Sequence, residues 1–92
     1  ELLELTGMIH RQFRLLIQAR EILDAGGKAQ DIERELQVLG FVARKLSDQA
    51  RRFSLAQLLE IYDRLLKIDH DMKTGGTPGD VAYELLIADL TR

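Results

Sequence analysis

His70, flanked by Asp69 and Asp71, is the stretch whose residue types are best suited to chemistry. A His-Asp dipeptide can supply ligands to the divalent metal of a hydrolase, but such a site needs further His and Asp ligands from other helices. The second histidine, His10, falls on the polar side of the first predicted helix. We therefore predict that His70 and Asp71 are surface residues and that the chain holds no metal ion.

Asp69 is the acid that interrupts an apolar helical stripe, and an acid in that position must be paired, hydrated or functional. The stripe comprises Leu55, Leu58, Leu59, Tyr62, Leu65 and Leu66. Lys73 follows Asp69 by four residues, in the favourable order for a helical ion pair, and is its predicted partner. Arg20 is the alternative partner, because it shares a sector of the helical wheel with the apolar stripe of the first helix. Both pairings make Asp69 a structural residue.

Other catalytic motifs are missing from the sequence. Ser47 and Ser54 have no histidine at a spacing that would activate a nucleophile. The segment 75–78, Gly-Gly-Thr-Pro, lacks the preceding strand and the lysine of a phosphate-binding loop. We therefore expect no catalytic activity from this chain, no cofactor and no small-molecule ligand.

Five helices and no strands are predicted to carry these residues, so the expected fold is an all-α five-helix bundle. The apolar periodicity predicts helices at roughly 2–25, 29–36, 41–52, 54–75 and 77–91. The first helix is long and ends at Gly26-Gly27, and the second and third are short and separated by a tight turn at Gly40.

Three capping signals delimit the fourth predicted helix and the start of the fifth. Ser54 followed three residues later by Gln57 is a capping-box start, and 75–76, Gly-Gly, is a left-handed stop. Thr77 as N-cap and Pro78 at the first helical position then start the apolar fifth helix.

The composition fits one small helical domain of 92 residues with little stability to spare. Leu occurs 17 times and Val 3 times, a balance that favours helices over strands. The 13 basic and 15 acidic residues leave a net charge of −2, so no overall positive field would recruit nucleic acid or anionic lipid. No apolar run approaches the ~18 residues of a membrane span, and no membrane association is expected. The chain contains no cysteine. Its start at Glu1 suggests a piece of a longer protein.

The first and fifth predicted helices carry more apolar surface than a small bundle needs. Roughly half the circumference of the first helix is apolar, and the fifth is apolar almost all round. The alternatives are a well-wrapped central helix or an interface with another subunit or domain, and the repeated excess favours the interface. The interface residues chosen by wheel position are Met8, Leu15, Ile22, Tyr83, Ile87 and Leu90.

The second and third helices suggest an alternative function. Their apolar spacing on either side of Gly40 matches a helix-turn-helix. Nearby basic residues could contact nucleic acid, and they are Arg44, Lys45, Arg51 and Arg52. However, a DNA reader places polar or basic residues at the start of its recognition helix, and here the start is 41–43, Phe-Val-Ala. A DNA-binding module is therefore kept as the second hypothesis.

Several stretches occur in an order that is specific as a set. They are 11–17 in the long first helix, the short helix with Ile32 and Leu36, 42–46, 49–55, and 69–75 before the apolar last helix. In this order and spacing the chain resembles the C-terminal domain of the bacterial DNA polymerase III delta subunit, a clamp-loader component. The resemblance covers about Leu5 to Leu90.

This resemblance implies a function that the residues alone do not supply. In the family, the domain follows an AAA+-like module and joins its counterparts in other subunits to form the collar of the clamp loader. The chain would then be a single domain, 1–92, that mediates assembly during DNA replication in the bacterial cytoplasm. Its partners would be the other clamp-loader subunits, with DNA contact permitted but not required. The complete protein would be a non-catalytic subunit of the DNA polymerase III holoenzyme.

Overall fold

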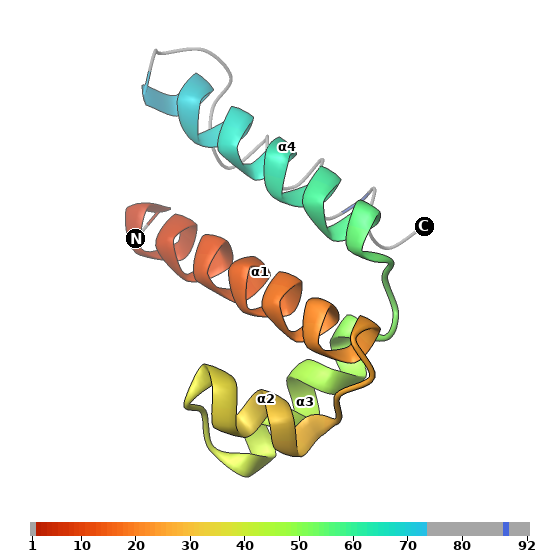
Figure 1. The fold of residues 1–92 in the computed structure, drawn as a ribbon. Helices are drawn as coiled ribbons and strands as arrows, with labels where there is room; N and C mark the ends of the chain where they lie inside the picture. Colours follow the sequence, from red (N-terminus) through yellow and green to blue (C-terminus); the bar gives the residue numbers. More distant parts are fainter. Residues whose placement is uncertain (1, 74–87, 89–92) are drawn as a thin grey trace.

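The computed structural model describes residues 2–73 and residue 88, and within these it is entirely helical, without strands (Figure 1). The helices are α1, Leu2–Asp24; α2, Ala29–Leu36; α3, Gly40–Ala50; and α4, Leu55–Lys73. The all-α prediction is confirmed, but the described residues contain four helices where five were expected. The predicted fifth helix at 77–91 lies outside the described residues, apart from Ala88.

Glycines end α1 as the sequence predicted. Gly26 adopts a left-handed φ of +90°, and the Gly27 N–H donates to the carbonyl of Ile22 over 2.9 Å. A Cβ on Gly27 would lie 2.6 Å from Cγ2 of Ile22, so any other residue would force the turn to shift. Both glycines are therefore required, one for its conformation and the other for the close approach.

The turn between α2 and α3 differs from the prediction. Gln37, with φ of 54°, is the left-handed residue that ends α2, and its N–H donates to the carbonyl of Glu33. Gly40 was expected to make this turn but is the first residue of α3, which Leu39 precedes in an extended conformation. The reversal is complete by Leu39, and Gly40 therefore does not need a left-handed conformation.

The capping box of α4 is confirmed. The Ser54 N–H donates to Oε1 of Gln57 over 2.8 Å, and the Gln57 N–H donates to Oγ of Ser54 over 3.1 Å. Two backbone N–H groups that the helix itself cannot satisfy are thus paired with side chains. The predicted stop at 75–76 lies outside the described residues.

α1 and α4 lie side by side and run antiparallel, and we call this pair the α1–α4 hairpin, although α2 and α3 separate the two helices in the chain (Figure 1). α2 and α3 pack against the C-terminal half of α1. All four helices contribute to the main core, whose buried members are Leu16, Ala19, Ile32, Ala43, Leu46, Ala50 and Leu58. A second cluster, centred on Ile61 and Leu65, lies between α1 and α4. The fold therefore has a compact end made of α1, α2 and α3, from which the α1–α4 hairpin projects.

α4 buries only part of the face that the sequence predicted. Leu58 and Leu65, which were placed on the stripe, are fully buried, and Ile61, which was not placed on it, is buried as well. Leu59 and Leu66 were placed on it, yet 50% and 45% of their surfaces are exposed. α4 is apolar over about half its circumference, and α1 covers only one side of that arc. The predicted stripe was thus wrong in its centre, because the position of α1 decides which residues are buried.

Candidate functional site

The residues with catalytic potential are not brought together. His70 and Asp71 are exposed on the last turns of α4, as predicted, whereas Asp69 is half-buried. His10 lies on α1 with its ring edge-to-face to Tyr62, the centroids 5.9 Å apart. Tyr62 precedes His70 by two turns of helix, about 12 Å, so the two histidines do not share a site. In the described part of the chain no group of three or more His, Cys, Asp or Glu residues could hold a metal ion.

Lys73 and Arg20 were the two predicted partners of Asp69, and the structure describes only the side chain of Arg20. The side chain of Lys73 lies outside the described residues, so that ion pair stays a prediction. Arg20 instead holds Asp24, its Nη2 2.6 Å from Oδ1, and donates to the carbonyls of Ala50 and Phe53 at 3.3 and 3.4 Å. These carbonyls lie before the start of α4, and Asp69 comes fourteen residues after Leu55, about 21 Å along the helix. Arg20 therefore fastens the α3–α4 connection to α1.

Arg14 and His10 are polar residues of α1 that contact α4. Nη1 of Arg14 donates to the hydroxyl of Tyr62 over 3.3 Å. His10 was expected on the polar side of α1, but it is half-buried, and its Nε2 is buried without a hydrogen-bond partner among the described residues. The sequence could not identify these contacts, because they depend on which side of α1 meets α4.

The basic residues of the helix-turn-helix hypothesis are all exposed. Arg44 and Lys45 lie on the second turn of α3, and Arg51 and Arg52 directly follow the helix. The beginning of α3, which a DNA reader would direct into the major groove, exposes two large apolar side chains, Leu39 and Phe41. This end of the domain is therefore better suited to contact an apolar surface of another molecule than to bind the phosphates of DNA.

The predicted interface residues differ in their exposure. Met8 is 68% exposed on α1, as an interface residue should be. Leu15 and Ile22 are half-buried and pack against the main core, so much of their surface is used within the domain. Tyr83, Ile87 and Leu90 lie outside the described residues, and their assignment stays a prediction.

Sequence reasoning missed most of the large apolar side chains that are exposed. In addition to Met8, the structure exposes Leu5, Leu39, Phe41, Leu59 and Leu66. The width of the apolar arc on α4 was a usable signal, because one neighbouring helix cannot cover half of a helix's circumference. These side chains are the candidates for a contact with another protein.

A shallow depression at the α1–α2 turn, with a volume of about 450 Å³, is explained by the turn itself. Among its lining residues are Glu21, Gly26, Asp31, Arg34 and Glu35. Asp31 accepts from the backbone N–H of Lys28 and from the Arg34 guanidinium, both over 2.7 Å. The Lys28 N–H and the Arg34 side chain lower the pKa of Asp31 below its usual 3.8. The carboxylate thus caps α2 and is not directed at a ligand.

The described residues thus form a small helical domain that leaves several large apolar side chains exposed. A family model for the DNA polymerase III delta subunit, C-terminal domain, matches residues 1–90. The chain belongs to this family. None of the described helices combines the length and apolarity needed to cross a membrane.

Two individual proteins agree with this assignment. The DNA polymerase III subunit delta of Bacillus subtilis (strain 168) is 32% identical over 92 residues, which is all of this chain and 26% of that protein. The solved structure of the Bacillus subtilis DNA clamp loader delta protein superposes with a TM-score of 0.85 at 32% identity. That match covers 98% of this chain and 26% of the solved chain. The chain thus spans about a quarter of the length of the relatives it matches.

Proposed function

We propose that this chain is the collar domain of a clamp-loader delta subunit and that it joins the subunit to the other clamp-loader subunits during DNA replication. Membership of the delta C-terminal domain family supports the replication context. The observation that supports an assembly role is the set of large apolar side chains left exposed on α1, on α4 and at the α2–α3 turn.

The proposal includes what surrounds the domain. An AAA+-like module precedes it in the complete subunit, which acts in the bacterial cytoplasm as a non-catalytic part of the DNA polymerase III holoenzyme. A fifth helix at 77–91 completes the bundle, and Tyr83, Ile87 and Leu90 add to the contact surface. About three quarters of the length of the matched delta subunits lies outside the match, which leaves room for such a module.

The test is reconstitution. The chain, fused to its upstream residues as in the complete subunit, is mixed with the remaining purified clamp-loader subunits of the same bacterium, and complex formation is followed by size-exclusion chromatography with light scattering. We expect a stoichiometric complex, and Met8→Asp should weaken it while leaving the helical circular-dichroism signal unchanged. A matched control is Lys67→Asp, an exposed change on the charged side of α4. Failure of the wild-type subunit to enter any complex would refute the assembly function.

A further inference from the structure

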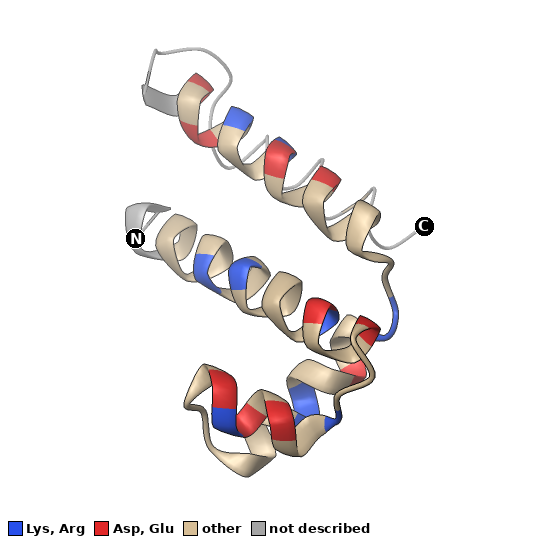
Figure 2. Ribbon diagram, viewed as in Figure 1, with Lys and Arg blue, Asp and Glu red and all other residues tan. Residues whose placement is uncertain are grey.

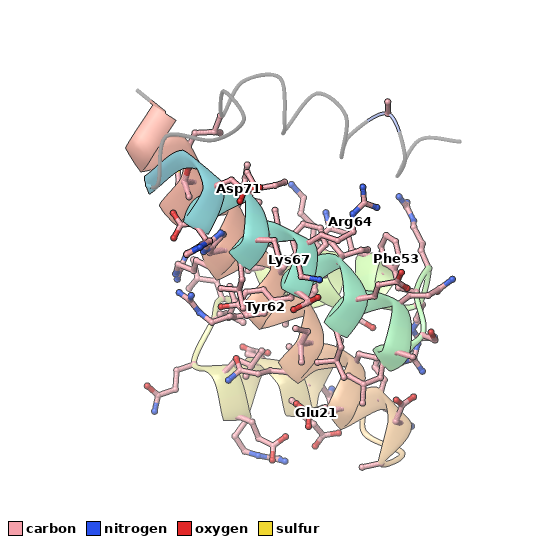
Figure 3. All side chains as sticks on the ribbon, turned by 90° about the horizontal axis from the view of Figure 1, so that it is seen from above. Glu21, Phe53, Tyr62, Arg64, Lys67 and Asp71 are labelled. Atoms are coloured by element: carbon pink, nitrogen blue, oxygen red, sulfur yellow. The ribbon has the colours of Figure 1, made fainter. Side chains whose placement is uncertain are left out.

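The exposed apolar residues of α4 lie on one side of the helix, around Tyr62. Leu59 precedes Tyr62 by three residues and Leu66 follows it by four, so the three side chains share one face. Figure 3 shows Tyr62 on the opposite side of α4 from Arg64. Both leucines expose about half of their surface. They form a short apolar band that the described helices leave uncovered.

A basic band runs beside it on α1. Arg14 is tied to Tyr62 by its hydrogen bond to the phenolic oxygen, and Arg11 lies one turn earlier on the same side of α1. Both arginines are exposed, and neither forms an ion pair with a described side chain. Residues 5–20 contain no Asp or Glu. Figure 2 shows basic positions along the middle of α1 with no acidic position between them. We call these two bands together the α1–α4 face.

The two bands fit an amphipathic helix with acidic residues along one edge. Packed helices lie about 8–10 Å apart, so a third helix resting on both can place apolar side chains on Leu59 and Leu66. The acidic edge of that helix then lies over Arg11 and Arg14. Arginine presents a fork of N–H donors that matches a carboxylate, and Tyr62 uses only one guanidinium nitrogen of Arg14.

The same face is poorly suited to nucleic acid. A phosphate backbone would meet two arginines, but the leucine band would remove water from the charged phosphates without replacing its hydrogen bonds, at a cost. The net charge of −2 also gives no general attraction to DNA. Leucine, tyrosine and arginine on one face instead make up a protein interface, in which tyrosine and arginine are the side chains that most often dominate the binding energy.

We propose that the α1–α4 face docks an acidic amphipathic helix of a neighbouring clamp-loader subunit. This inference rests on the proposed assembly function and specifies the surface and the chemistry of its partner. The apolar band supplies most of the affinity, and the arginines steer the acidic edge into register.

The test uses the reconstituted clamp loader and two variants of the complete subunit. Arg11→Glu/Arg14→Glu should weaken binding to the other purified subunits by about tenfold or more in low salt and much less in high salt, because salt screens the lost attraction. Leu59→Asp/Leu66→Asp should weaken binding by at least about tenfold at both salt concentrations. The matched control is Arg51→Glu/Arg52→Glu, which reverses two exposed charges next to α3 and should bind as wild type. Circular dichroism checks that all variants keep the helical fold.

The outcomes separate this inference from the function on which it rests. Wild-type affinity of both α1–α4 variants would overturn the docking face, and the assembly function would stand if Leu39→Asp/Phe41→Asp then prevented complex formation. A wild-type subunit that fails to assemble would refute the assembly function itself. Normal assembly of Arg11→Glu/Arg14→Glu, together with weakened binding of the loader to duplex DNA, would show a nucleic-acid surface and overturn the proposal.

Discussion

The core leucines of the compact end and the outer leucines of the projecting α1–α4 hairpin differ in their exposure. At the compact end Leu16 and Leu46 are almost fully buried, whereas on the hairpin Leu59 and Leu66 remain half exposed. Residue type does not cause this difference in exposure, because all four residues are leucines. Its cause is the number of neighbours, because α1 at the compact end packs against α2 and α3 as well. An apolar side chain is thus buried where described helices converge on it and exposed where they do not.

The largest expected effect tests this contrast directly. Leu46→Ala should lower the free energy of unfolding by about 3 kcal/mol, because it leaves a cavity in the main core. Leu66→Ala on the hairpin should cost less than about 1 kcal/mol, since half of that side chain already contacts water. Chemical denaturation followed by circular dichroism measures both. Equal losses for the two variants would show that the hairpin leucines are core residues after all.

Arg20 joins the two regions, and its removal should have the next largest effect. Arg20→Met keeps the aliphatic stem but removes the guanidinium donor from the carbonyls of Ala50 and Phe53, of which the Ala50 carbonyl keeps the Phe53 N–H, and should cost about 1–3 kcal/mol. The control, Arg34→Met, removes an exposed ion pair with Asp31 and should cost less than about 1 kcal/mol. Thermal denaturation compares the two variants. If they were equally stable, the α3–α4 connection would not depend on Arg20.

A substitution in the turn between α2 and α3 should have a smaller effect of opposite sign, because it should stabilise the domain. Gln37→Gly should stabilise the domain by up to about 1 kcal/mol, because glycine adopts the left-handed conformation of residue 37 without a steric penalty. Gly40→Ala is the matched change at a helical position and should also be tolerated. Urea unfolding midpoints provide the measurement. A destabilised Gln37→Gly would mean that the glutamine side chain, and not its backbone, holds the turn.

The smallest expected effect concerns pH and is confined to the compact end. The folded-state pKa of Asp31 lies below its usual 3.8, so this carboxylate stabilises the fold above that pH and loses its contribution as pH falls below it. Asp31→Asn should therefore flatten the fall in stability on acidification through this range. Thermal midpoints measured at a series of acidic pH values test this. If the variant showed the same pH dependence of stability as the wild type, protonation of Asp31 would not contribute to the loss of stability in acid.

Local features could be predicted because a few neighbouring residues determine them. The capping box of Ser54 and Gln57, the bounds of α2 and the glycine end of α1 all follow from the preferences of successive residues. The turn before α3 was assigned to Gly40 because glycine adopts left-handed conformations most easily. The chain uses Gln37 instead, since its N–H completes the end of α2 and the packing of α2 on α3 sets where the reversal falls.

The sequence by itself determined that the chain is helical, where α1 ends, where α2 lies, where α4 begins, and to which family the chain belongs, because these depend on residue order and local preference. Only the tertiary structure decided that Ile61 is buried and Leu59 exposed, that Arg20 holds the α3–α4 connection, and that Arg11 and Arg14 lie beside an apolar band. These facts depend on which side of one helix meets another. In a helix that is apolar over half its circumference, the positions of the neighbouring helices decide which apolar residues are buried.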